Sequence, residues 1–78
     1  MGQIRTPECA AIDAELGMLV PEASDIETLK DDYSLDYMIW ITVNGEVYPI
    51  RVTVEEYRDG DWRSNVALAV GMLMEQSA

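Results

Sequence analysis

The chain has 78 residues, of which 15 are acidic and 5 are basic, so its formal net charge is −10. This charge argues against binding nucleic acid or an anionic membrane, because neutralising phosphate groups requires clustered Lys and Arg. Histidine is absent and there is one cysteine, which excludes an internal disulfide and a structural zinc site of the usual kind. With 49% hydrophobic residues, the chain is expected to fold as one domain over residues 1–78.

The first predicted element is a helix over about residues 7–18, after a short lead-in at residues 1–5. Thr6 as N-cap, a proline at the first helical position and an acid in the first turn are a helix-start signature. Apolar residues from Cys9 to Leu16 recur at helical spacing. We therefore expect Cys9 to be a small buried hydrophobe rather than a reactive thiol.

The distribution of basic and apolar residues along the chain predicts no targeting signal. The N-terminus has no basic region followed by an apolar run, so no signal peptide is predicted. No apolar stretch approaches the roughly 20 residues that a membrane span needs. Together with the single cysteine, this predicts a cytoplasmic protein.

A second, short helix is expected at about residues 25–32. Ser24 and Glu27 match a capping box, in which a hydroxyl and a carboxylate satisfy each other's unpaired backbone N–H groups. Ile26 and Leu29 would then point inward.

Residues 35–54 predict a β-hairpin. Asn44-Gly45 lies at the centre between two runs of β-branched and aromatic residues, and a type I′ turn needs positive φ at both of its central positions. The turn predicts the cross-strand pairs Val43–Glu46, Ile41–Tyr48, Ile39–Ile50, Tyr37–Val52 and Leu35–Val54. One face is then almost wholly apolar, and we expect helices to cover it because an isolated hairpin is marginally stable.

A final helix, capped by Asp61 or Ser64, is expected to run to about Gln76 and to pack on the face holding Ile39, Ile41, Ile50 and Val52. Its apolar stripe is wider than a two-stranded sheet can cover, because it also includes Leu68, Met72 and Met74. Gly71 costs this helix about 1 kcal/mol relative to Ala. Such a cost is usually accepted where another backbone approaches closely.

The segment between the hairpin and the final helix has two interpretations. Asp59-Gly60 marks a turn. Alternatively, Thr53 caps a helical turn and Glu56 closes the capping box. The predicted element order is α-α-β-β-α, which indicates an α+β fold with an antiparallel hairpin packed against helices.

No catalytic signature is apparent, and we expect no enzyme activity, cofactor or metal. The commonest general base, His, is missing, and a Cys nucleophile would lack an activating imidazole. Paired acids occur at Asp31-Asp32 and at Asp59 and Asp61, but neither pair fits a calcium loop, and a turn with a helix cap explains the second pair. No glycine-rich phosphate loop follows a strand.

One segment is unusually acidic. Within fifteen residues lie Glu22, Asp25, Glu27, Asp31, Asp32 and Asp36, opposed only by Lys30. This density indicates either a solvated face or a docking surface for Lys and Arg of a partner. On the second interpretation Asp31, Asp32 and Asp36 are the main candidates, because Asp25 and Glu27 would also serve the first turn of the predicted helix.

The outer hairpin face carries a second candidate feature. Met38, Trp40, Val47 and Pro49 form an apolar patch, and Arg51 lies diagonally from Trp40, within reach of a cation–π contact. This patch is either a partner surface or a second core covered by a helix. The predicted partner-binding residues are Asp31, Asp32, Asp36, Trp40, Met38 and Glu27.

In type, the acidic run EASDIETLKDDYSLD and the compact αβ domain resemble the small acidic inhibitors encoded by phages, including anti-CRISPR proteins and DNA mimics. Those proteins share no alignable motif, so no functional residue carries over. The resemblance implies a non-enzymatic protein that blocks a basic, nucleic-acid-binding surface of a partner protein. The alternative is a structural protein that self-associates, as a homodimer for example, through the hairpin face or the C-terminal helix.

Overall fold

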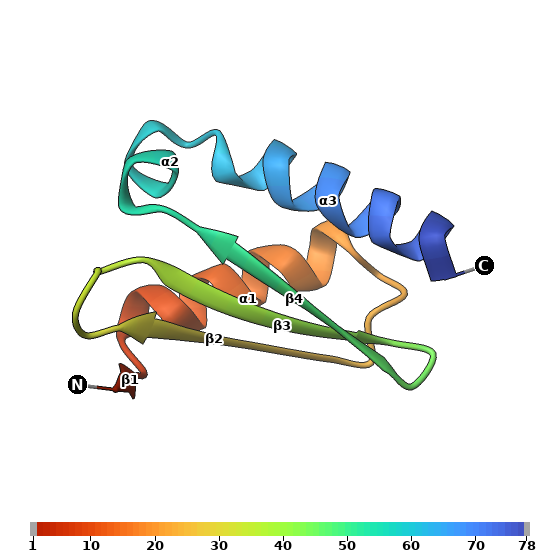
Figure 1. Cartoon of the computed structure of the whole chain (residues 1–78), viewed down its shortest axis with the longest axis horizontal. Helices are drawn as coiled ribbons and strands as arrows, with labels where there is room; N and C mark the ends of the chain where they lie inside the picture. The colour runs from red at the N-terminus through yellow and green to blue at the C-terminus, as the bar shows by residue number, and fades with distance from the viewer. Residues whose placement is uncertain (1, 78) are drawn as a thin grey trace.

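The computed structural model describes residues 2–77, which form a four-stranded antiparallel sheet packed against helices (Figure 1). The elements are β1 (Gln3–Ile4), α1 (Pro7–Leu19), β2 (Asp25–Asp31), β3 (Tyr37–Val43), β4 (Glu46–Val52), α2 (Val54–Asp59) and α3 (Trp62–Ser77). The strands lie in the order β1-β2-β3-β4. The predicted α+β class is confirmed, with the hairpin packed against helices.

The β3–β4 hairpin forms as predicted. Asn44 and Gly45 have φ angles of 53° and 82°, as a type I′ turn requires. The observed register contains the predicted pairs Val43–Glu46, Ile41–Tyr48, Ile39–Ile50 and Tyr37–Val52. The predicted pair Leu35–Val54 is wrong, because β3 begins at Tyr37 and Leu35 lies in the preceding loop with a φ of 67°.

The helix predicted at residues 25–32 is wrong, because Asp25–Asp31 is the strand β2, paired with β3. Ser24 does not cap a helix. Its backbone N–H and its hydroxyl both donate to the carbonyl oxygen of Thr42, at 2.8 and 3.3 Å. The reason is tertiary: β3 is apolar on its buried face and needs a neighbour at each edge, and this pairing outweighs the local capping signal.

The N-terminal helix is close to its prediction. It runs over Pro7–Leu19, and the backbone N–H of Cys9 donates to the Thr6 hydroxyl at 3.4 Å. Cys9 is fully buried, as expected. Part of the predicted lead-in, Gln3–Ile4, forms a short edge strand on β2, whereas residue 1 lies outside the described residues.

The alternative helical turn after the hairpin is confirmed as α2. Thr53 is its N-cap, Glu56 closes the capping box, and Gly60 ends it in the left-handed conformation with a φ of 86°. The final helix, α3, then begins directly after Asp61. No close approach explains Gly71 within the described chain, since a Cβ added there would meet nothing within 4 Å.

The core lies between one face of the sheet and the helices α1 and α3. Its buried members include Ile39, Ile41, Ile50 and Val52 from the sheet, Ile12 and Leu16 from α1, and Trp62, Val66 and Val70 from α3. The C-terminal helix therefore packs on the predicted face. In Figure 1 the strands pass in front of α1, and the sheet face turned to the viewer carries no helix.

Polar contacts fix the two helices on this core. The Thr28 hydroxyl, fully buried on β2, donates to Asp13 of α1 at 2.5 Å, and Arg5 donates to the same carboxylate at 2.7 Å. Arg63 of α3 forms a bidentate ion pair with Glu15 of α1. These contacts bridge β2 to α1 and α1 to α3.

The turn at Gly45 can be tested by replacing this residue with Val. A Cβ at this site would meet no atom within 4 Å, so the cost is that of holding a β-branched residue at positive φ, at least about 1–2 kcal/mol. We expect the melting temperature to fall by about 4–8 °C for each kcal/mol.

The matched control is Gly17→Ala in α1, where the space is also open and φ is not positive. This change should stabilise the protein by up to about 1 kcal/mol, because Ala is a better helix former. Equal melting temperatures for Gly45→Val and the wild type would contradict the turn.

Candidate protein-binding surface

The sheet face opposite the core is open. Along β3, Tyr37, Ile39 and Ile41 are buried, whereas the alternate residues Met38 and Trp40 are only partly buried. We call the open side the outer sheet face. It comprises Met38, Trp40 and Thr42 of β3, Asp25, Glu27 and Leu29 of β2, and Val47, Pro49 and Arg51 of β4. The interpretation of this face as a second core under a helix is therefore wrong.

Trp40 lies at the centre of the outer sheet face. The register places Glu27 on one side of it and Pro49 on the other, and both neighbours are exposed. Asp25 is also exposed and lies beside Thr42. The face therefore combines an apolar centre with acids along the β2 side, and Trp and Met are residues that interface centres favour.

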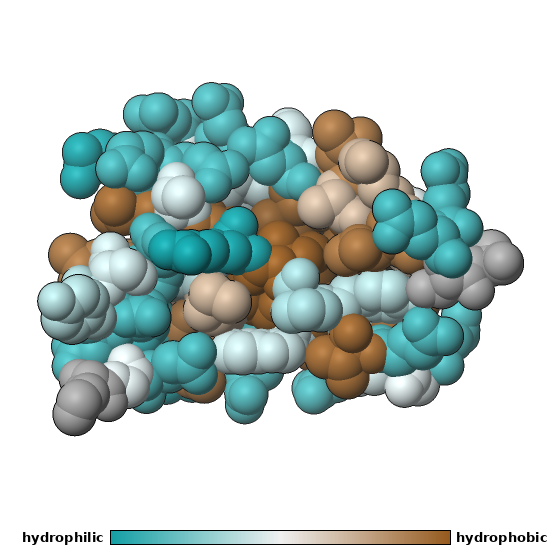
Figure 2. Space-filling model, in the orientation of Figure 1, coloured by the Kyte–Doolittle hydropathy of each residue, from teal (hydrophilic) through white to brown (hydrophobic). Residues whose placement is uncertain are grey.

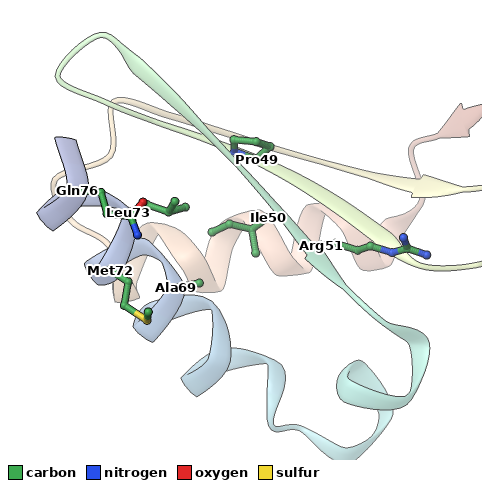
Figure 3. A pocket seen from close by; sticks show the side chains of 7 residues that line it. All are labelled: Pro49, Ile50, Arg51, Ala69, Met72, Leu73 and Gln76. Carbon is green, nitrogen blue, oxygen red and sulfur yellow. The ribbon is translucent and has the colours of Figure 1, made fainter.

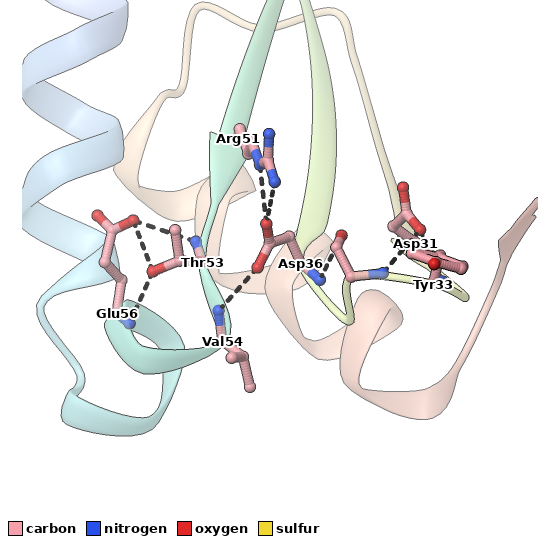
Figure 4. Close-up of polar contacts among 8 residues, drawn as sticks. Asp31, Tyr33, Asp36, Arg51, Thr53, Val54 and Glu56 are labelled. Carbon is pink, nitrogen blue, oxygen red and sulfur yellow. Dashed lines mark hydrogen bonds and ion pairs between the residues drawn. The ribbon is translucent and has the colours of Figure 1, made fainter.

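Asp36 has an internal role that the sequence did not reveal. Its side chain is buried and accepts hydrogen bonds from Arg51, through Nε at 2.8 Å and through Nη2 (Figure 4). It also accepts from the backbone N–H of Val54 at 3.3 Å. The prediction that Asp36 is available to a partner because it lacks an internal role is wrong.

Arg51 is accordingly turned toward Asp36 and not toward Trp40. The carboxylate raises the pKa of Arg51, chiefly by hydrogen bonding and then by charge. The ion pair takes the place of the cation–π contact that the sequence suggested for this arginine.

Asp31 also has an internal role. Its carboxylate accepts from the backbone N–H groups of Tyr33 at 2.7 Å and Ser34 at 3.1 Å. These donors hold the pKa of Asp31 below its usual value of 3.8 and fix the β2–β3 loop in an Asx-type turn. Asp32 is exposed in this loop, and its backbone N–H donates to the carbonyl of Gly2 at 2.9 Å. The three aspartates singled out from the sequence thus do not present equivalent free carboxylates.

A second acid organises the start of α2. Glu56 Oε1 accepts from the backbone N–H of Thr53 at 3.1 Å, and the Thr53 hydroxyl accepts from the backbone N–H of Glu56 at 3.2 Å (Figure 4). Asn65 donates to the other oxygen at 2.8 Å. The Thr53 N–H first, and then Asn65, lower the pKa of Glu56. Together, Asp36 and the capping box satisfy first-turn N–H groups that a helix leaves unpaired.

The charged side chains that take part in no ion pair described above are mostly acidic and lie at the surface. Ion pairs engage Arg5 with Asp13, Arg51 with Asp36 and Arg63 with Glu15. Lys30 lies over the Tyr37 ring, 5.7 Å from its centroid. Exposed acids include Glu8, Glu22, Asp25, Glu27, Glu46, Glu55, Asp59, Asp61 and Glu75. These internal ion pairs engage three of the five basic residues, so the exposed surface of the described residues is predominantly acidic.

A groove of about 370 Å³ runs between the edge strand β4 and α3 (Figure 3). Its lining residues are Pro49, Ile50, Arg51, Ala69, Met72, Leu73 and Gln76. Figure 2 shows apolar residues gathered between α3 and the sheet, bordered by hydrophilic ones. The wide apolar stripe of the C-terminal helix was the only sequence signal for this groove.

Among residues 2–77, no group of three or more His, Cys, Asp or Glu side chains is arranged to hold a metal ion. Within the same range, no helix is long and apolar enough to cross a membrane. Comparison of the chain with protein-family models, curated proteins and solved structures gave no match.

Replacing Asp36 with Ala should destabilise the protein by about 2 kcal/mol, because the Val54 N–H and the Arg51 guanidinium lose a buried acceptor. Urea denaturation measures this change. Asp25→Ala, at an exposed acid of β2, is the matched control and should stay within about 0.5 kcal/mol of the wild type. Equal effects of the two changes would contradict the internal role of Asp36.

Glu56 predicts a dependence of stability on pH. Its pKa is lower in the folded state than its ordinary value of 4.5, so its carboxylate stabilises the fold fully above about pH 5 and loses this effect as the pH falls through the folded-state pKa. In Glu56→Gln the side chain cannot titrate. We expect the free energy of unfolding of this variant to fall less between about pH 5 and pH 3 than that of the wild type. Identical slopes in pH-dependent denaturation would contradict this assignment.

Proposed function

We propose that the protein is a non-enzymatic binding protein that engages a basic surface of a partner protein through the outer sheet face and thereby inhibits the partner. The observation that supports this most is the open face around Trp40, with the exposed acids Glu27 and Asp25 beside it. Trp40 and Met38 are partly buried on this face, and Val47 beside them is 55% exposed. Apolar residues gathered on an exposed surface are a common mark of an interaction site.

The two components of the face would contribute differently. An exposed ion pair contributes only about 0–1 kcal/mol, so Trp40 and Met38 would supply most of the affinity as apolar anchors. Glu27 and Asp25 would steer the encounter and select for Lys and Arg on the partner. These two acids replace Asp31 and Asp36 as the favoured carboxylates, because both aspartates accept internal hydrogen bonds.

Inhibition follows from the charge of the molecule. With a net charge of −10, the protein would compete with phosphate groups for a basic, nucleic-acid-binding surface, as an anti-CRISPR protein or a DNA mimic does. A cytoplasmic setting is part of this proposal and suits the unpaired thiol of Cys9.

Self-assembly is the second candidate, and α3 supplies the observation that favours it. Leu68 and Met72 on this helix are 67% and 55% exposed. Against it stands the net charge, because two copies would each bring a charge of −10 to the interface.

The test is affinity capture of a partner on the wild-type chain, followed by titration of the purified partner at low and high salt. Trp40→Ala and Glu27→Lys should each weaken binding by about tenfold or more. Wild-type affinity should also fall with salt, because the acids are exposed.

The matched control is Glu55→Lys, which makes the same charge change at an exposed acid of α2 that is not one of the residues of the outer sheet face. It should alter binding much less than Glu27→Lys. Equal effects of the two lysine variants, with no effect of Trp40→Ala, would overturn the proposal.

A further inference from the structure

The groove between β4 and α3 adjoins the outer sheet face, because Pro49 and Arg51 belong to both. Its other wall is formed by Ala69, Met72 and Leu73 of α3 (Figure 3). A partner seated on the outer sheet face would therefore reach the groove without a break in the contact.

The apolar wall extends beyond the groove. Met72 lines it, and Leu68 lies one helical turn earlier on the same side of α3. Both side chains are largely exposed. A ridge of apolar residues beside a groove is the surface into which an amphipathic helix places its own apolar stripe.

A strand is a poorer occupant than a helix. β4 is an edge strand of the sheet. An added strand would have to accept hydrogen bonds from the backbone N–H groups of β4 that point outward. Pro49, near the middle of β4 and opposite Trp40, has no N–H, and prolines in sheets occur where this missing donor faces the free edge. The free edge of β4 therefore lacks one of the donors that pairing with another strand would use.

The charge around the groove favours a basic occupant. Arg51, the cation in the lining, is already paired with Asp36. The last turn of α3 contains no basic residue, and Glu75, one turn after Met72, is exposed. The C-terminal end of a helix also carries partial negative charge. A second copy of this chain would bring a like charge to this place, so a basic partner is favoured over a homodimer.

We propose that this groove binds a basic amphipathic helix of the partner, with an apolar side chain in the groove and Lys or Arg beside Glu75. This inference rests on the proposed function, since the helix would belong to the same partner. It adds a second anchoring point and the secondary structure of the segment that is recognised.

The probe is a short peptide of Leu and Lys at helical spacing, titrated into the isotope-labelled full chain and followed by NMR. We expect the largest shifts at Ala69, Leu73 and Gln76. Ala69→Leu, which fills the groove, should weaken the affinity for the peptide by about tenfold. Ala67→Leu, an exposed position on the same helix, is the matched control and should change the affinity by less than about twofold.

Further peptides and variants separate the outcomes. A peptide with Ser in place of Leu should bind weakly and without shifts in the groove, and one with Glu in place of Lys should not bind. Met72→Gln provides a second groove variant, at an exposed site, should Ala69→Leu prove unstable. The proposal would be overturned if the peptide shifted the NMR signals of exposed acids all over the chain and neither groove variant changed the affinity for the peptide.

The oligomeric state provides another contrary outcome. A wild-type chain that dimerises with rising concentration, and becomes monomeric in Ala69→Leu, would assign the groove to a second copy and overturn the proposal. Failure of the proposed function is distinguishable from this. If Trp40→Ala abolishes partner binding while Ala69→Leu leaves it unchanged, the outer sheet face acts alone and only the groove assignment is wrong.

Discussion

Ile39 and Ile41, on the inner side of β3, are fully buried beneath the helices, and this burial determines how the other elements lie. A two-stranded hairpin cannot shield such a face, so β2 joins the second edge of β3 and the helices α1 and α3 cover one side only. With both long helices on that side, no helix of the described chain covers Trp40 on the other side, where it is only partly buried. The open surface is thus a direct consequence of how the core is closed.

The buried carboxylate of Asp36 is the second constraint, and it sorts the acids into two groups. It holds Arg51 and the first turn of α2 in place, as Asp31 holds its loop and Asp13 joins α1 to β2. These carboxylates serve the fold. Acids such as Glu27 and Glu75 lie exposed beside apolar side chains of the outer sheet face and of α3, where recognition would use them.

Features set by local residues were predictable, and those set by distant contacts were not. Asn44-Gly45 determines its own turn, and the Thr53 capping box involves residues three apart, so both were visible in the sequence. β2 was missed because the local pattern of Ser24 and Glu27 predicts the start of a helix. The strand conformation of β2 comes instead from its pairing with β3, which the local pattern does not contain.

The candidate site followed the same rule. Asp36 looked free because its partner, Arg51, is fifteen residues away. Trp40 and Met38 were correctly placed on the outer face, since the hairpin register alone fixes their side. Predicting the groove would require the position of α3 against β4, which depends on contacts distant in the sequence. In the sequence, only the excess width of the apolar stripe on the C-terminal helix indicated it.

The central claim is that the outer sheet face is open in the free protein. Relaxation of side-chain protons by a neutral paramagnetic agent in the solvent tests it directly, with the two tryptophans as internal references. We predict strong relaxation of the Trp40 ring at every protein concentration, and almost none of the Trp62 ring, which is 2% exposed in the core. A Trp40 ring as protected as that of Trp62 would contradict the account, because the face would then be covered by the chain itself or by a second copy.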